Sequence, residues 1–130
     1  MRIEHVALQV ANPVEMAEWY ERHLGCSIAR RGPEPACIRF LKDGSGRSMI
    51  EIYRNPRAPV PDYSRMDPAL VHVAFVSDDL PADRDRLLGA GATLADDVMT
   101  TPAGDQLLML RDPWGLALQL VSRANPMLVP

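Results

Sequence analysis

Two histidines occupy equivalent positions in a pattern that occurs twice along the 130-residue chain. His5 begins a His-Val-Ala run, and His72 begins the same run 67 residues later. Glu51 follows the first histidine by 46 residues, and Gln119 follows the second by 47. Two neutral imidazoles, a carboxylate and an amide oxygen suit a divalent transition-metal ion, and they leave two octahedral positions open for water or substrate. The spacing therefore predicts one metal site built from both halves of the chain.

The carboxylate and the amide each lie in an apolar, strand-like run. Glu51 stands between Ile50 and Ile52, and Gln119 stands between two leucines. A buried carboxylate must be paired, metal-bound or neutralised, because an unpaired charge away from water is too costly. A single strand histidine usually needs only a hydrogen bond, but the duplication of both positions favours metal binding. Gln119 is left with two roles, direct coordination or a hydrogen bond to water or substrate.

The elements that carry these residues follow the same order twice. Asn12-Pro13 and Asp79 each begin a predicted helix, and glycines follow the end of each one. Predicted strands occupy 3–10, 26–31, 35–42, 47–54, 69–76, 92–98, 104–110 and 116–122. Each half therefore has the order β-α-β-β-β. The predicted organisation is a single domain, 1–130, with module one at 1–54, a proline-rich linker at 55–68, module two at 69–123 and a tail at 124–130.

Composition and charge narrow the class of protein. The net charge of -3 comes from interspersed signs with no basic block, so nucleic acid is not an expected partner. No window approaches 18 apolar residues, and no leader-like segment precedes the first strand, so neither a membrane span nor export is expected. Cys26 and Cys37 are too few for a disulfide framework and indicate reduced thiols in a soluble, cytoplasmic protein.

Motifs along nearly the whole chain resemble the vicinal oxygen chelate superfamily, also called the glyoxalase/bleomycin resistance/dioxygenase group. They are His5-Val6-Ala7, Trp19-Tyr20-Glu21-Arg22-His23-Leu24-Gly25, Arg111-Asp112-Pro113-Trp114-Gly115 and Gln119-Leu120-Val121. The resemblance implies an α+β fold in which two βαβββ modules pair into a curled mixed sheet around a metal cavity. It also implies that the metal ligands are His5, Glu51, His72 and Gln119, and that the protein is a homodimer.

Within this group the pattern is closest to glyoxalase I. That resemblance implies a metal-dependent lyase or isomerase, similar to lactoylglutathione lyase, acting on a small oxygen-chelating substrate with Glu51 as the catalytic base. Gln119 departs from the pattern, because an amide cannot accept the proton that the usual Glu accepts, so Glu51 or a metal-bound hydroxide must do so. Gln9 stands where a basic residue is expected to hold glutathione, which leaves Arg30, Arg31 or Arg39 to contact an acidic substrate.

Two alternatives stay open. An extradiol ring-cleaving dioxygenase would use His5, His72 and Glu51 around iron(II), although the dioxygenase pattern has its carboxylate where Gln119 stands. A non-catalytic protein of the bleomycin-resistance type would sequester a ligand at a dimer interface, in a cavity lined by aromatic residues. The candidates for that lining are Trp19, Trp114, Tyr53 and Tyr63. Nickel, cobalt, manganese, zinc and iron all accept the predicted nitrogen and oxygen ligands.

Overall fold

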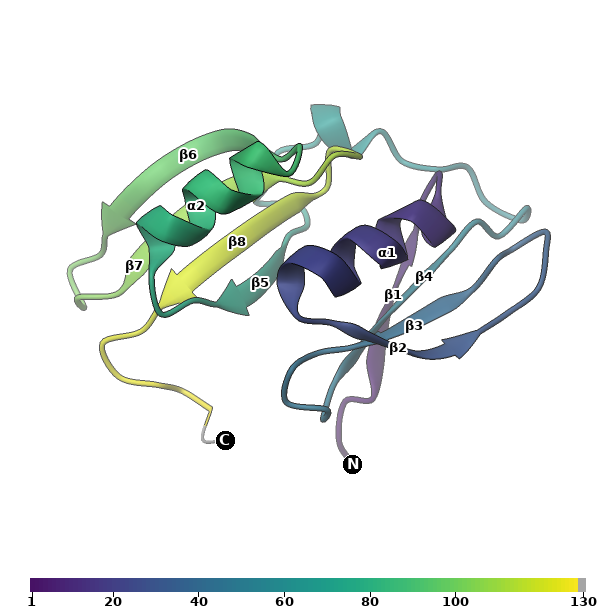
Figure 1. Ribbon diagram of the computed structural model, residues 1–130, viewed down its shortest axis with the longest axis horizontal. Helices are drawn as coiled ribbons and strands as arrows, with labels where there is room; N and C mark the ends of the chain where they lie inside the picture. The colour runs from purple at the N-terminus through teal and green to yellow at the C-terminus, as the bar shows by residue number, and fades with distance from the viewer. Residues whose placement is uncertain (129–130) are drawn as a thin grey trace. The chain divides into compact units, whose positions relative to one another are not determined.

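The computed structural model describes residues 1–128; residues 129 and 130, the end of the predicted tail, lie outside the described part. The chain divides into two compact units, Met1–Pro61 and Asp62–Pro130, and each has its own sheet and helix (Figure 1). The first unit contains β1 (His5–Gln9), α1 (Pro13–Leu24), β2 (Ser27–Arg31), β3 (Arg39–Lys42) and β4 (Met49–Tyr53). The second contains the 3₁₀ helix η1 (Tyr63–Arg65), β5 (Val73–Val76), α2 (Leu80–Gly89), β6 (Thr93–Thr100), β7 (Gln106–Arg111) and β8 (Ala117–Ser122). The two predicted βαβββ modules are therefore confirmed.

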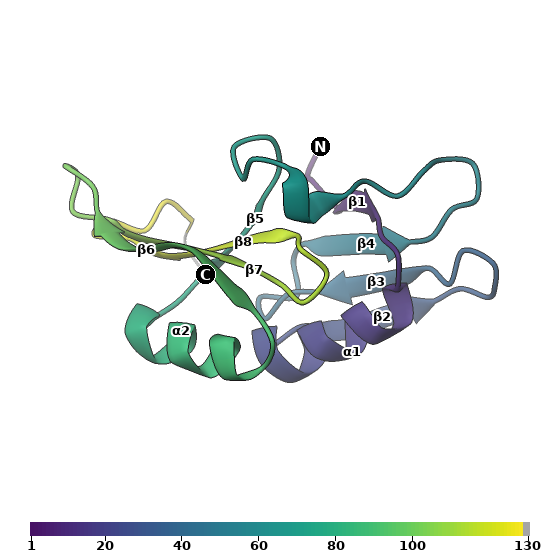
Figure 2. The same ribbon diagram turned by 90° about the horizontal axis from the view of Figure 1, so that it is seen from above.

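The two sheets have the same topology. Their strand orders are β1-β4-β3-β2 and β5-β8-β7-β6, and in each the first strand runs parallel to the last while the other pairs are antiparallel. One helix covers one face of each sheet (Figure 2). In the first unit Met16 and Tyr20 of α1 are fully buried, as is Ile52 of β4. Because strand side chains alternate, the neighbours of Ile52 project from the opposite face of the sheet.

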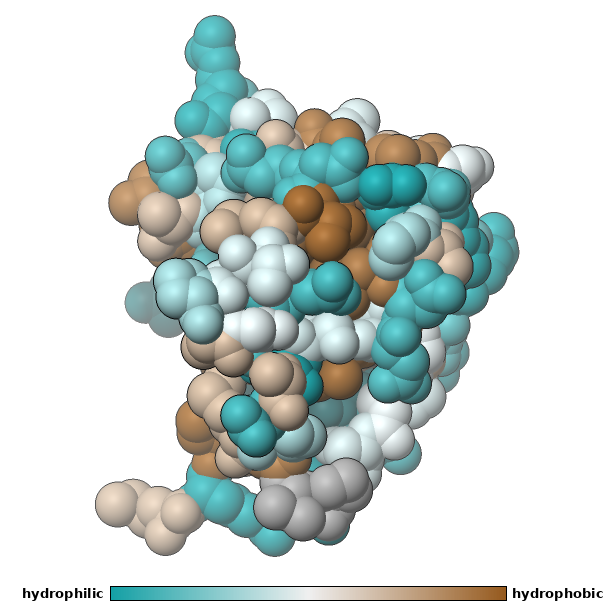
Figure 3. Space-filling model, turned by 90° about the vertical axis from the view of Figure 1, so that its left-hand side faces the viewer, coloured by the Kyte–Doolittle hydropathy of each residue, from teal (hydrophilic) through white to brown (hydrophobic). Residues whose placement is uncertain are grey.

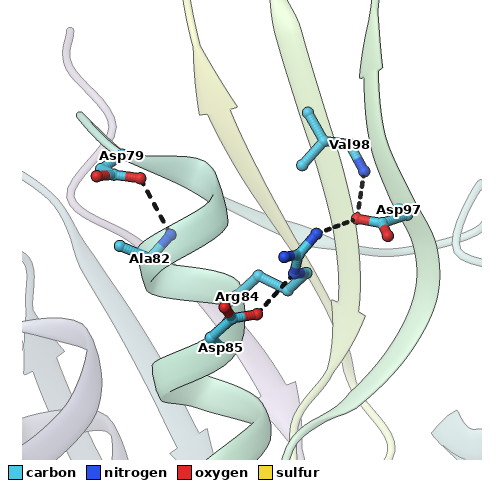
Figure 4. Close-up of polar contacts among 6 residues, drawn as sticks. All are labelled: Asp79, Ala82, Arg84, Asp85, Asp97 and Val98. Carbon is cyan, nitrogen blue, oxygen red and sulfur yellow. Dashed lines mark hydrogen bonds and ion pairs between the residues drawn. The ribbon is translucent and has the colours of Figure 1, made fainter.

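The two helices begin differently. α1 starts at Pro13 and ends where Gly25 adopts a left-handed φ of 67°, as predicted, but the side chain of Asn12 makes no capping hydrogen bond. α2 starts after Asp79, whose Oδ1 accepts a hydrogen bond from the backbone N–H of Ala82 at 3.0 Å (Figure 4). One turn later, Arg84 pairs with Asp97 at 2.9 Å and ties α2 to the edge strand β6.

The difference between the two caps can be measured. Asp79→Ala removes an acceptor from a helix N-terminus and is expected to lower the free energy of unfolding by about 1 kcal/mol. Asn12→Ala is the matched control, because its side chain caps nothing and its loss should change stability far less. Urea unfolding followed by tryptophan fluorescence compares the two variants. Equal losses at both positions would show that the Asp79 bond contributes nothing specific.

Two predicted strands are shorter than expected. β5 begins only at Val73, because Asp67 forms a turn in which its backbone oxygen and its carboxylate accept from the N–H groups of Leu70 and Ala69 at 2.9 and 2.8 Å. His72 therefore lies just before the strand. β3 begins at Arg39 rather than near residue 35, since Cys37 has a positive φ of 49°. The predicted linker also contains the short helix η1.

The Arg111–Gly115 motif has a structural role in the second unit. Arg111 donates to the backbone oxygens of Tyr63 and Met66, at 2.8 Å in each case, and so holds η1 against the turn between β7 and β8. Asp112 is 2% exposed, and its Oδ1 accepts from the N–H of Trp114 at 2.9 Å and closes the same turn. Charged and buried groups that satisfy backbone atoms in this way fix the path of both segments.

Both cysteines are free thiols. Burial, together with the smaller effect of the carboxylates of Asp43 and Glu21, raises the pKa of the Cys26 thiol to about 11. A thiol with a high pKa is a poor nucleophile near neutral pH, so Cys26 acts as a small core residue. Cys37 is half-buried.

Several large apolar side chains are exposed at the surface. Within residues 1–128 no helix is long and apolar enough to cross a membrane. Hydrophobic and hydrophilic residues are interspersed on the face shown in Figure 3. Exposed apolar residues lie on the edge strands: Val6 on β1 and Val76 on β5 have 60% and 79% of their surface accessible, and Leu94 and Met99 on β6 have 45% and 53%.

Candidate functional site

His5 and Glu51 lie side by side in the first unit. β1 and β4 run parallel with Ala7 opposite Glu51, which places His5 on the same face, two residues earlier. The Nε2 atom of His5 is 3.3 Å from Oε2 of Glu51. Both side chains are partly covered, at 33% and 15% exposure. The structure therefore brings together half of the predicted ligand set.

Glu4, which was not among the predicted site residues, orients His5. Glu4 lies 2.5 Å from Nδ1 of His5 through Oε2. A carboxylate accepts hydrogen bonds, so Glu4 would hold a proton on Nδ1 of His5 when Nε2, the nitrogen that faces Glu51, binds an ion. Phe40 of β3 packs edge-on against the imidazole, with ring centroids 5.4 Å apart. An acceptor behind a histidine in this way is the usual support of a metal ligand.

His72 and Gln119 repeat the arrangement in the second unit. β5 and β8 run parallel with Ala74 opposite Gln119, the same register that joins Ala7 to Glu51. His72 again lies two residues before the alanine. Its Nδ1 is 2.8 Å from the backbone oxygen of Pro68. Because a carbonyl oxygen only accepts, Nδ1 donates this hydrogen bond, and Nε2 is the ring nitrogen that could bind an ion.

The His5–Glu51 pair fits a divalent ion. Metal–ligand distances of about 2.1 Å place neighbouring ligands of an octahedron about 3.0 Å apart, close to the 3.3 Å between Nε2 and Oε2. Among residues 1–128 no group of three or more His, Cys, Asp and Glu side chains could by itself hold a metal ion. The predicted ligands fall instead into two pairs, one in each unit.

Gln9 and the three arginines named for contact with an acidic substrate differ in whether their side chains already bond to the backbone. Gln9 is occupied: its Nε2 donates to the backbone oxygens of Asn55 and Ala58, at 2.6 and 2.7 Å, and holds the loop after β4. Arg39 is occupied as well, because its Nη1 donates to three backbone oxygens between residues 32 and 38. Arg30 and Arg31 are exposed on β2.

Of the aromatic candidates for a cavity lining, Trp19 and Tyr63 are buried and Tyr53 is half-buried. Trp19 is 9% exposed and packs in α1 against the rings of Tyr20 and His23. Tyr63 is 8% exposed within η1. Tyr53 is half-buried on β4, on the same face as Glu51. A cleft of about 360 Å³ in the first unit is lined by residues 11–15, 34, 35, 37 and 54, and none of the predicted ligands is among them.

The sequence profile of the Glyoxalase/Bleomycin resistance protein/Dioxygenase superfamily matches residues 2–120. The chain therefore belongs to this superfamily, as the duplicated βαβββ order and the paired His–Glu and His–Gln positions had indicated. A comparison with proteins of curated function found no match.

Solved structures share the fold over nearly their whole length. The crystal structure of SMU.1112c is 26% identical in sequence, with 94% of this chain and 98% of that chain covered and a TM-score of 0.71. A glyoxalase family protein from Bacillus cereus is 18% identical, with coverages of 93% and 91% and a TM-score of 0.69. TnmS3, an antibiotic binding protein from Streptomyces sp. CB03234, is 17% identical, with coverages of 92% and 93% and a TM-score of 0.67.

Proposed function

We propose that the protein is a metal-dependent lyase or isomerase of the glyoxalase I type, acting on a small substrate that chelates the ion through two oxygen atoms. One observation carries the proposal: the His5–Glu51 pair recurs in identical strand register as His72 and Gln119. In both pairs the Nδ1 atom of the histidine meets an acceptor, an arrangement that supports Nε2 as the proposed ligand atom. The four residues would hold one divalent ion, which is nickel, cobalt, manganese, zinc or iron.

Each residue has a part in the proposed reaction. The bound ion would supply Lewis-acid polarisation of the substrate oxygens. Glu51 would take a proton from one carbon of the substrate and return it to the neighbouring carbon. Glu4, which lies against Nδ1 of His5, would hold the imidazole with Nε2 directed at the ion. Gln119 accepts no proton, and so it coordinates the ion or positions water or substrate.

The proposed assembly is a cytoplasmic homodimer. β1 and β5 are edge strands of their own sheets and expose Val6 and Val76, and an unpaired apolar edge is a surface that proteins normally cover. The two free thiols, Cys26 and Cys37, suit a reducing compartment.

Metal analysis tests the proposal. Protein purified without a histidine tag or chelator is expected to contain close to one divalent ion per chain, and the His5→Ala/His72→Ala variant is expected to have lost it. His23→Ala is the matched control, because His23 packs on Trp19 within α1. The control should retain the metal of the wild type.

A metal-free wild type would favour the second candidate function. If the protein takes up no ion after incubation with nickel, zinc and iron(II), it is better described as a ligand-sequestering protein. The fold shared with TnmS3, an antibiotic binding protein, is the observation that supports this candidate. Metal retained in the double variant would also contradict the proposed ligands.

A further inference from the structure

One row of side chains crosses the sheet of the first unit on the face away from α1. The registers join Ala7 to Glu51, Glu51 to Phe40 and Phe40 to Arg30, so the row runs over β1, β4, β3 and β2. Residues directly opposite one another on paired strands project from the same face. Neighbouring strands lie about 4.8 Å apart, which places the backbone of Arg30 about 10 Å from that of Glu51.

Phe40 connects the two ends of this row. Its ring packs edge-on against His5 with centroids 5.4 Å apart. On its other side, the guanidinium carbon of Arg30 lies 6.0 Å from the ring centroid. A guanidinium at this distance is attracted by the ring, so Phe40 holds the arginine over the sheet face rather than leaving it to extend into solvent.

Arg30 differs from its two arginine neighbours. The Nη1 atom of Arg39 donates hydrogen bonds to backbone oxygens. Arg31 is paired with Arg39 and therefore projects from the other face. Within residues 1–128, Arg30 has no carboxylate partner and no side-chain hydrogen bond, and the ring of Phe40 is its one contact of this kind. Its fork of N–H donors is therefore available to a ligand.

We propose that Arg30 binds an anionic group of the substrate, an assignment that rests on the proposed function. The substrate would be a small amphipathic acid, with two oxygen atoms at the His5–Glu51 end, an apolar or aromatic body over Phe40, and a carboxylate or similar anion at Arg30. Charge supports this class. The predicted ligand set includes a single carboxylate, that of Glu51. The positive charges of a bound divalent ion and Arg30 therefore exceed the negative charges of Glu51 and Glu4. A sheet face with net positive charge attracts an anion.

Two matched chelators test the assignment. Catechol and 3,4-dihydroxybenzoate share an aromatic ring and two adjacent oxygens, and the second carries a carboxylate on the far side of the ring. Their affinities for the zinc-loaded protein are measured by titration calorimetry, since zinc does not support redox turnover. The wild type is expected to bind 3,4-dihydroxybenzoate about 10-fold more tightly than catechol, through charge-assisted hydrogen bonds to Arg30.

The variants separate this inference from the proposed function. Arg30→Gln is expected to remove the preference for the acid while leaving catechol affinity unchanged, and Arg31→Gln, on the opposite face, is expected to keep the preference. Equal affinities of the wild type for the two chelators would overturn the assignment of Arg30. An equal loss of affinity for both chelators in Arg30→Gln would overturn it as well. Neither result would contradict the proposed metal site. A protein that takes up none of zinc, nickel and iron(II) would overturn both.

Discussion

Glu51→Gln is expected to abolish turnover while leaving part of the bound metal in place. Glu51 is the one carboxylate among the four predicted ligands, and it faces Nε2 of His5 at 3.3 Å. The glutamine amide keeps an oxygen that can coordinate, but it cannot take up a proton. Loss of a positioned general base typically costs 10²- to 10⁴-fold, so we expect a fall in kcat of about 10³-fold. The measurement is isomerisation of the hemithioacetal of methylglyoxal and glutathione, with metal content determined on the same samples.

A variant that moves the carboxylate provides the control. Gln119 occupies the register position in the second unit that Glu51 occupies in the first. In the Glu51→Gln/Gln119→Glu protein the number of ligands and their total charge are unchanged, and the base has exchanged modules. Partial recovery of turnover is expected, because the proposed four-residue site would then present the same set of atoms with the carboxylate on the other module. If Glu51→Gln alone keeps more than a tenth of the wild-type kcat, the base is a different group.

The fold was predictable because its signals are local and occur twice. Alternation around Ile52 defines which face of β4 meets α1, and Gly25 ends α1 in the left-handed conformation that favours glycine. The same order of signals recurs in the second half, so each module supports the interpretation of the other. The start of β5 was less predictable, since the turn at Asp67 depends on a side-chain bond to the N–H of Ala69 that spacing alone does not require.

The site was predictable in part. The sequence paired His5 with Glu51 through nearly equal spacings in the two halves, 46 and 47 residues, and the register of β1 and β4 brings these two together. The sequence did not distinguish Arg30 from Arg31 as a substrate contact. The pairing of β2 with β3 shifts between Ile28 and Arg30, and a shift of one residue exchanges the faces of everything after it. Such an irregularity leaves no mark in the hydrophobic pattern.

The residues that support the candidate ligands could be predicted from the sequence only in part. Gln9, which stands where the glyoxalase I pattern has a basic residue, holds the backbone of Asn55 and Ala58. Pro68 supports His72 through a carbonyl oxygen, which every residue type has, so no sequence pattern identifies it. Glu4 was identifiable in principle, because a carboxylate next to a strand histidine is within reach of Nδ1.

Gly115→Ala is expected to destabilise the protein by about 3 kcal/mol. Gly115 has a φ of +91°, and a Cβ added there would lie 2.7 Å from the backbone nitrogen of Ser64 and 2.8 Å from its Cα. The left-handed conformation costs about 1 kcal/mol for alanine, and overpacking typically costs 1 to 3 kcal/mol more. Ser64 cannot move away freely, because Arg111 holds the oxygens of Tyr63 and Met66 on either side of it.

Gly91→Ala separates the contact from the backbone conformation. Gly91 has a similar φ of +101°, but its added Cβ would meet only the side chain of Pro113 at an ordinary 3.5 Å. Denaturant unfolding should therefore show a loss of about 1 kcal/mol for Gly91→Ala, well below that for Gly115→Ala. Equal losses in the free energy of unfolding would mean that the close approach of Gly115 to Ser64 does not add to the cost of the substitution. Because η1 leads to the Pro68 carbonyl that orients His72, the Gly115 variant should also bind metal more weakly, whereas Gly91→Ala should not.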